Sequence, residues 1–332
     1  MRYFKIFLLL FFFSSGLYAQ LVTIDGIPRD TSFTLHSAYV KALKQYPDIK
    51  KVLPALPANV QAIEGIIYSV PVENRNLKLN LYRPQDDNKY PVLLMVHGGG
   101  WSSGDLSMQI PMAQQIASHG YVAIPVEYRL SPEAPYPAAV LDLKTAIRWI
   151  RANADAYKID TTHIAISGCS AGGQLAMLVG MTNFQQEYET SGEYPEFRSN
   201  VHAVVNIDGI SDFSTDEWEA TKESLAKKKI PASIKWLGGT YDDKREAWLS
   251  ASPVHHITKD SAPVCFINSS IPRFHGGRNE AIEILSGYDI YTEVHVVNDT
   301  PHPFWLFHPW FDSAVAHTVS FLDKMLKMKK ME

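Results

Sequence analysis

The sequence predicts an α/β fold: an eight-stranded, mostly parallel sheet with helices on both faces. Apolar strand-like runs alternate with helical periodicity from residue 63 onward, a pattern typical of a parallel sheet crossed by helices. Hydrophobic residues make up 46% of the chain and charged residues 20%, which is a globular composition. The length of 332 residues is enough to bury one large core in a single domain.

Eight strands are expected along the chain. The first two, at 63–70 and 77–82, form an opening hairpin, and the others occupy 92–96, 122–126, 164–167, 201–207, 264–268 and 291–297. Helical patterns fill the intervals at 108–118, 138–152, 172–181 and 278–285, and a last helix occupies 311–328. The long segment 211–250, rich in Trp, Lys and Glu, is expected to form an insertion over one end of the sheet.

Residues 1–19 are expected to be a secretory signal peptide. Arg2 and Lys5 precede an apolar run at 6–13, and small residues follow up to Ala19. The apolar run is too short for the ~20 residues that a membrane-spanning helix needs. The signal therefore predicts a secreted or periplasmic protein that has no membrane span after cleavage.

Domain organisation and charge narrow the possible functions. Residues 20–60 are expected to form an N-terminal appendage with one helix at 34–45, and the sheet domain occupies 61–330. The chain has 31 Lys+Arg against 35 Asp+Glu and no basic cluster, so we exclude nucleic acid as a partner. Cys169 and Cys265 lie in or beside apolar runs and are expected to be buried thiols. No ligand spacing indicates a metal site, and no cofactor is expected.

The motif GCSAG at 168–172 contains the candidate nucleophile, Ser170. It follows the strand at 164–167 and opens the helix at 172–181, and this strand–turn–helix context identifies a nucleophile elbow. The turn is so sharp that only small residues fit beside the serine. It raises the Ser170 hydroxyl to the top of the sheet, next to the positive end of the helix.

The motif HGGGW at 97–101 directly follows the strand at 92–96. Acyl transfer develops negative charge on the carbonyl oxygen, and backbone N–H groups stabilise this charge best where no side chain blocks their approach. We expect the N–H groups of Gly99 and Gly100 to converge with that of Ala171, the residue after the nucleophile, in an oxyanion hole.

Three motifs, HGGGW, EYRLSPEAPYPAA at 127–139 and GCSAGG at 168–173, resemble the α/β-hydrolase fold in its hormone-sensitive-lipase-like and feruloyl- and acetyl-xylan-esterase-like branch. The resemblance covers residues 63–327. The segments at 267–275 and 300–305 further resemble secreted bacterial carbohydrate esterases that act on pectin. The resemblance implies a serine esterase whose triad residues follow the chain order Ser, acid, His.

The general base is expected on the loop after the last strand, as the resemblance implies. His302 lies in this loop between two prolines, which hold the backbone rigid. His295 lies inside the strand and is expected to be a packed or surface residue. His308, among aromatic residues, is the competing candidate.

The triad acid departs from the pattern of the relatives. Most of them carry an Asp after the strand that ends here at Asn268, whereas residues 268–277 of this chain contain no carboxylate. Some α/β-hydrolases take the acid from the end of the preceding strand, where this chain has Asp208. Asp208 is therefore our candidate, and a turn-forming role for its Asp-Gly pair is the alternative. The other carboxylates considered are Glu280, Asp289, Asp212 and Asp299.

Arg273 occupies the position that the usual acid has vacated. A guanidinium binds a carboxylate through two hydrogen bonds, which suits a uronic acid; pairing with a local Asp or Glu is the alternative. Trp101 and Trp305, with Phe304, are candidates for an apolar platform under a sugar ring, and core packing is their competing role.

These features predict a secreted serine esterase that hydrolyses small ester groups on plant oligosaccharide or polysaccharide substrates. Arg273 favours a pectin methylesterase, and an acetyl (xylan or pectin) esterase or a feruloyl esterase are the alternatives. A serine peptidase is disfavoured, because the appendage at 20–60 is too short for the β-propeller that such relatives carry. A non-catalytic glycan-binding homologue is suggested by the missing acid but opposed by the intact elbow and glycine loop.

Overall fold

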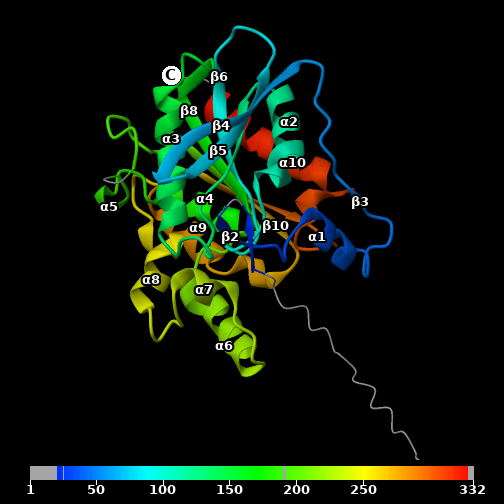
Figure 1. Cartoon of the computed structure of the whole chain (residues 1–332), viewed down its shortest axis with the longest axis vertical. Helices are drawn as coiled ribbons and strands as arrows, with labels where there is room; N and C mark the ends of the chain where they lie inside the picture. The colour runs from blue at the N-terminus through cyan, green and yellow to red at the C-terminus, as the bar shows by residue number, and fades with distance from the viewer. Residues whose placement is uncertain (1–20, 25, 190–191, 328–332) are drawn as a thin grey trace, which may run out of the picture.

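An eight-stranded sheet forms the centre of the computed structural model, which describes residues 21–24, 26–189 and 192–327 (Figure 1). The expected signal peptide at 1–19 lies outside the described residues. The strands lie in the order β11-β10-β9-β8-β6-β7-β5-β4. Their bounds are β4 Val60–Val72, β5 Arg75–Pro84, β6 Tyr90–Val96, β7 Val122–Val126, β8 Ile159–Cys169, β9 Ala203–Ile207, β10 Val264–Ser269 and β11 Thr292–Val297.

All eight expected strands are present in this sheet, which confirms the predicted fold class. β4 and β5 form the antiparallel hairpin, and β5 is antiparallel to β7. The other neighbours pair in parallel. Every residue of β6 from Val92 to Val96 is fully buried, as expected for a parallel strand covered on both faces.

Helices cover both faces of the sheet. α2 (Ile110–Ser118) and α10 (Phe311–Leu322) share one buried core, and α3 (Ala138–Ala152), α4 (Ala171–Met181) and α9 (Arg278–Gly287) share the other. These helices correspond to the five expected ones. The remaining short elements outside residues 211–250 are η1 Leu106–Gln109, α5 Gln186–Glu189, η3 Pro253–His256, η4 Pro272–His275, η5 Phe304–Leu306 and η6 Asp323–Lys327.

Residues 21–59 pack against the sheet domain. They contain the hairpin β1 (Leu21–Ile24) and β2 (Ile27–Asp30), the helix α1 (Leu35–Ala42) and β3 (Lys50–Lys51). β3 pairs antiparallel with β12 (Phe307–His308), which lies more than 250 positions later in the chain. The segment also adds four buried side chains to the core of α2 and α10: Ala38, Ala42, Ile49 and Val52.

Residues 211–250, which we call the cap, form the expected insertion at one end of the molecule (Figure 1). They contain the π-helical turn η2 (Phe213–Glu217) and the helices α6 (Trp218–Ala226), α7 (Ala232–Leu237) and α8 (Arg245–Ser250). Aromatic packing attaches the cap to the sheet domain: Trp236 stacks on Trp101 with the ring centroids 5.0 Å apart.

Cys169 ends β8 and Cys265 lies in β10, and both thiols are buried and free. This confirms the expectation of buried thiols. Across the described ranges, we find no helix that is long and apolar enough to cross a membrane.

Candidate active site

The residues singled out from the sequence follow the ends of neighbouring parallel strands. Ser170 comes directly after β8, Asp208 directly after β9, and the loop 97–101 directly after β6. Arg273 and His302 lie on the loops that follow β10 and β11. Because the carboxyl ends of parallel strands meet at one edge of a sheet, the topology brings these segments together.

Ser170 occupies a sharp turn with a backbone φ of 55°, in the left-handed region. The glycines beside it are required by packing. A Cβ on Gly168 would lie 2.0 Å from the carbonyl oxygen of Gly172, and a Cβ on Gly172 would lie 2.3 Å from that of Val96. The Ser170 N–H donates to the Ile207 carbonyl at 2.7 Å, which fixes the turn against the end of β9.

Ser170, His302 and Asp208 form a hydrogen-bonded series. Nε2 of His302 lies 2.8 Å from Oγ of Ser170, and Nδ1 of His302 lies 3.0 Å from Oδ2 of Asp208. A neutral imidazole protonated on Nδ1 donates to Asp208 and accepts from Ser170. This geometry suits a general base acting on the serine hydroxyl.

Asp208 has a side chain that is 0% exposed, and residues at the end of β10 hold it in place. Oδ1 of Asp208 accepts hydrogen bonds from the Ser269 N–H at 2.7 Å and from Nδ2 of Asn268 at 3.3 Å. Nη1 of Arg278 donates to Oδ1 of Asn268 at 3.0 Å and so fixes the orientation of the amide. The strand end where the resemblance placed the acid therefore supplies donors to an acid that directly follows the neighbouring strand β9.

The other carboxylates considered from the sequence lie elsewhere. Glu280, Asp289 and Asp299 are exposed. Asp212 is buried, but its Oδ1 accepts hydrogen bonds from the N–H and the hydroxyl of Ser214, both at 2.8 Å. Of the five candidates, Asp208 is the one that forms a hydrogen bond with the histidine.

The competing histidines also lie away from Ser170. His295 stacks on His317 with the ring centroids 4.0 Å apart, and its Nε2 lies 3.1 Å from Glu293. Nδ1 of His308 lies 3.8 Å from a carboxylate oxygen of Asp312. The structure thus brings His302, and neither competitor, to the serine.

Two aromatic rings cover part of the His302 side chain, which is 22% exposed. Phe274 stacks on its face with the ring centroids 3.5 Å apart and an interplanar angle of 8°, and Trp305 lies edge-on at 5.3 Å. This burial lowers the pKa of His302 below its ordinary value, while the hydrogen bond with Asp208 acts in the opposite direction. The imidazole is therefore neutral near pH 7 and able to accept a proton.

The glycine loop offers backbone donors beside Ser170. Gly99 and Gly100 have φ values of 131° and 59°, which favour glycine. A Cβ on Gly99 would lie only 2.0 Å from the carbonyl oxygen of Ser103. Within the described part of the chain, no group accepts a hydrogen bond from the N–H of Gly99, Gly100 or Ala171, so all three remain available to an oxyanion.

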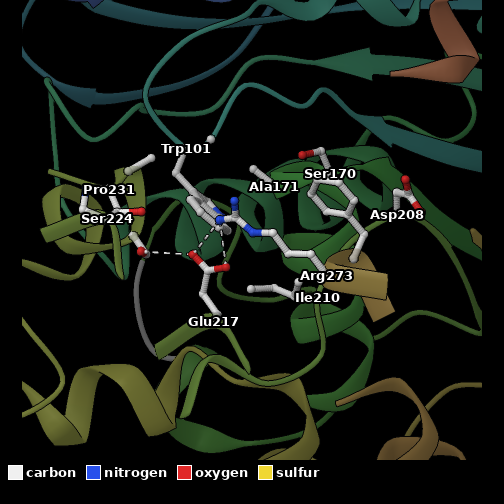
Figure 2. A pocket seen from close by; sticks show the side chains of 13 residues that line it. Trp101, Ser170, Ala171, Asp208, Ile210, Glu217, Ser224, Pro231 and Arg273 are labelled. Atoms are coloured by element: carbon white, nitrogen blue, oxygen red, sulfur yellow. Dashed lines mark hydrogen bonds and ion pairs between the residues drawn. The ribbon is translucent and has the colours of Figure 1, made fainter. Parts of the chain in front are cut away.

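A pocket of about 270 Å³ opens beside Ser170 (Figure 2). Trp101 and Phe274 contribute apolar walls, and the cap contributes the carboxylate of Glu217. Figure 2 shows the Arg273 side chain extending across the pocket toward Glu217. Nη2 of Arg273 lies 3.2 and 3.0 Å from the two carboxylate oxygens of Glu217.

The structure changes the expected substrate contacts. Arg273 lines the pocket, but it is paired with Glu217, which was the alternative considered for it. The expectation of a sugar platform at Trp305 and Phe304 is wrong: these rings are 4% and 0% exposed, because η5 turns both into the core under α10. Trp101 is 8% exposed and does line the pocket.

Sequence reasoning missed three residues of this site. Glu217 lies 56 positions before its partner Arg273, in a segment without any motif. Phe274 stands directly after Arg273, and this adjacency was its only signal. The sequence drew attention to Asn268 only as the end of a strand that no carboxylate follows, whereas its side-chain amide donates a hydrogen bond to Asp208.

One group of potential metal ligands lies outside the pocket. Cys265, Glu293 and His295 place one ligand atom each within 4.8 Å of one another, the single such group found among the described residues. Nζ of Lys324 already lies 2.6 Å from Glu293. Burial opposes ionisation of Glu293, but its hydrogen bonds, first of all that from Lys324, lower its pKa to about 2. The protein's own cation therefore already neutralises this carboxylate.

Sequence comparisons identify a family and several relatives. A family model described as BD-FAE matches residues 79–274. Esterase LipC of Mycobacterium tuberculosis is 34% identical over 199 residues, which cover 58% of this chain and 47% of LipC. Carboxylesterase NlhH of Mycobacterium tuberculosis is 41% identical over 90 residues, which cover 27% of this chain and 28% of NlhH. The chain thus spans about half, or less, of the length of these curated relatives.

Solved structures share the architecture. A structure described as a truncated form of a carbohydrate esterase from gut microbiota has a TM-score of 0.69 and 20% identity, covering 84% of this chain and 100% of that one. Butyrate-bound Est2 of Thermogutta terrifontis has a TM-score of 0.65 and 22% identity, covering 82% and 97%. An acetyl ester-xyloside bifunctional hydrolase of Caldicellulosiruptor lactoaceticus has a TM-score of 0.63 and 19% identity, covering 77% and 90%. These likenesses confirm the α/β-hydrolase fold that the motifs predicted.

Proposed function

This chain belongs to the BD-FAE family, and from that premise we propose that it is a secreted serine carboxylic ester hydrolase that removes small acyl groups from plant polysaccharide fragments. The observation that carries the proposal is the hydrogen-bonded series of Ser170, His302 and Asp208 beside three free backbone donors. A series of this kind on an α/β-hydrolase fold is the arrangement that acyl transfer to serine requires.

In the proposed reaction, Oγ of Ser170 attacks the ester carbonyl carbon while Nε2 of His302 takes the hydroxyl proton. The N–H groups of Gly99, Gly100 and Ala171 stabilise the oxyanion that forms. The intermediate collapses to an acyl-serine, and His302 passes its proton to the departing alcohol. His302 then takes a proton from the water that attacks the acyl-serine. When the second tetrahedral intermediate collapses, His302 returns this proton to Oγ of Ser170, and the acid leaves.

Asp208 acts on the reaction through His302. Its Oδ2 holds the proton on Nδ1, so that Nε2 keeps the lone pair that faces Ser170. The carboxylate also stabilises the imidazolium that forms when the proton is transferred. The donors from Ser269 and Asn268 keep this buried carboxylate in place.

The sugar part of the proposal rests on the relatives and on the pocket. The similar structures include a carbohydrate esterase, a bifunctional GH43-CE protein of Bacteroides eggerthii and an acetyl ester-xyloside hydrolase. The pocket volume of about 270 Å³ lies just below the ~300–1,000 Å³ that is usual for small-molecule sites, which suits a short acyl group.

An acetyl ester is favoured over the methyl ester of galacturonate. The preference for a pectin methylesterase rested on an Arg273 that is free to bind a uronate, whereas this guanidinium is paired with Glu217. The proposal of secretion rests on residues 1–19 alone, and detection of the processed chain in the culture medium or periplasm tests it.

An ester panel tests the proposed function. Wild-type protein and Ser170→Ala are incubated with p-nitrophenyl acetate, acetylated xylan, acetylated pectin and methyl-esterified pectin, and released nitrophenol, acetate and methanol are measured. We expect acetate release by the wild type and none above background by Ser170→Ala. Methanol as the main product would instead establish the methylesterase, and no turnover of any ester would favour a non-catalytic glycan-binding protein.

A further inference from the structure

We propose that the ion pair between Glu217 and Arg273 recognises the hydroxyl groups of a neutral sugar and discriminates against uronic acids. This inference rests on the proposed function and adds the class of sugar that carries the ester. The pair joins the cap to the loop after β10, and both side chains line the pocket of Ser170 (Figure 2).

Glu217 is a buried carboxylate beneath a more exposed arginine. Its side chain is 7% exposed, and that of Arg273 is 56% exposed. Oε1 of Glu217 accepts from Nη2 of Arg273 at 3.2 Å and from Oγ of Ser233 at 3.3 Å, and Oε2 accepts from Nη2 at 3.0 Å. The pair thus links the cap to the loop after β10.

Both partners retain hydrogen-bonding capacity. A guanidinium has five N–H donors. Only Nη2 of Arg273 donates to a described residue, so Nε and Nη1 still offer their protons. A carboxylate has about four acceptor positions, and Oε2 of Glu217 receives a single hydrogen bond. The pair therefore presents donors and acceptors side by side at the pocket wall.

A sugar hydroxyl matches this wall because it donates one hydrogen bond and accepts others. Two adjacent hydroxyls can donate to Glu217 and accept from Arg273 without breaking the ion pair. A uronate cannot do the same: its carboxylate competes with Glu217 for the guanidinium and brings a second negative charge next to the first. The geometry therefore favours an acetylated neutral sugar, such as a xylose unit.

The test compares two acetylated substrates that differ in charge, an acetylated xylo-oligosaccharide and an acetylated oligogalacturonate. The quantity measured is the ratio of kcat/KM for the anionic substrate to that for the neutral one. We expect Glu217→Gln to raise this ratio by about 10- to 100-fold, because it frees Arg273 for a uronate and weakens the acceptor for hydroxyls. Arg273→Gln should lower the ratio, since it leaves the carboxylate alone.

Glu219→Gln is the matched control. Glu219 also lies on the cap, in the first turn of α6, but it is 69% exposed and pairs with Lys222 at the surface. This variant should keep the wild-type ratio. A loss of folded protein lowers both rates by the same factor and leaves the ratio unchanged, so a shifted ratio reports recognition and not stability.

Two results would overturn the inference while leaving the proposed function intact. One is a wild-type enzyme that deacetylates both substrates equally well or prefers the anionic one. The other is a Glu217→Gln variant whose ratio equals that of the wild type, which would make the pair a structural link between the cap and the sheet domain. If neither sugar acetate is hydrolysed at all, the proposed function fails together with the inference.

Discussion

The backbone N–H of Ser269 donates a 2.7 Å hydrogen bond to Oδ1 of Asp208. The end of β10 thereby holds a carboxylate that β10 itself does not contain. Asn268 adds a second donor to the same oxygen, and Oδ2 remains for His302. An acid directly after β9 can thus reach and orient the histidine, because β9 and β10 are parallel neighbours whose ends meet at one edge of the sheet.

The first prediction concerns this acid. Asp208→Asn should lower kcat by up to ~10⁴, because an amide can donate to Nδ1 and so stabilise the wrong imidazole tautomer. Steady-state kinetics with p-nitrophenyl acetate measure the loss.

Glu280→Gln and Asp289→Asn are the controls for Asp208. Both carboxylates are exposed and lie on or next to α9, so these variants should remain within a few-fold of the wild type. A crippled Glu280→Gln with an active Asp208→Asn would place the acid after β10 and contradict the geometry described here.

Local motifs made much of this site predictable from the sequence. The elbow around Ser170 and the glycine loop are contiguous peptides whose chemistry is set by the backbone, so a short string of residues reveals them. His302 followed from its place after the last strand. Asp208 came from the resemblance, because some α/β-hydrolases carry the acid after the preceding strand, and four other carboxylates stayed open. The adjacency of β9 and β10 decides which acid faces the histidine, and this adjacency is a property of the folded sheet.

Contacts between distant segments were not predictable in the same way. Glu217 meets Arg273 only because aromatic packing places the cap over the strand ends, and no periodicity encodes that position. Trp305 was a candidate for a sugar platform, with core packing as its competing role, because the sequence does not reveal which side of a loop turns into the core. The sequence offered Trp101 and Trp305 equally as candidates for a sugar platform, and only Trp101 lines the pocket.

The second prediction concerns the nucleophile and the base. Ser170→Ala and His302→Ala should each lower kcat by ~10³ or more, and the double variant should be little worse than either, because the two residues act as a unit. If the losses in kcat of the two single variants multiply in the double variant, Ser170 and His302 act independently. The melting temperature of Ser170→Ala should match that of the wild type.

The third prediction concerns the glycine loop. Gly99→Ala places a Cβ 2.0 Å from the Ser103 carbonyl oxygen, at a position whose backbone φ is 131°. The loop must therefore shift, and its N–H groups no longer point at the oxyanion. We expect kcat to fall by ~10² to 10³, the usual effect of losing an oxyanion donor. Gly287→Ala is the control, because a Cβ there meets nothing within 4 Å. Unchanged kcat in a folded Gly99→Ala would remove this loop from the oxyanion hole.

The last prediction concerns pH. His302 must be neutral to accept the serine proton, and burial under Phe274 lowers its pKa, so the acid limb of kcat/KM should have its midpoint below the ordinary histidine value of ~6.5. In Phe274→Ala, water reaches the His302 ring, so burial lowers the pKa of His302 less. The carboxylate of Asp208 still stabilises the protonated imidazolium. The midpoint should therefore move to higher pH, and the variant should lose activity near pH 6 where the wild type retains it.

Initial rates with p-nitrophenyl acetate between pH 4.5 and 8 measure both midpoints. Phe184→Ala is the matched control, because Phe184 is 42% exposed and packs against Arg198, away from the pocket. Its acid limb should coincide with that of the wild type. If the limb of Phe274→Ala also coincides with the wild type, or moves to lower pH, burial by this ring is not what sets the titration of His302. The direction of the shift is decisive because general damage to the active site lowers the whole profile without moving its midpoint.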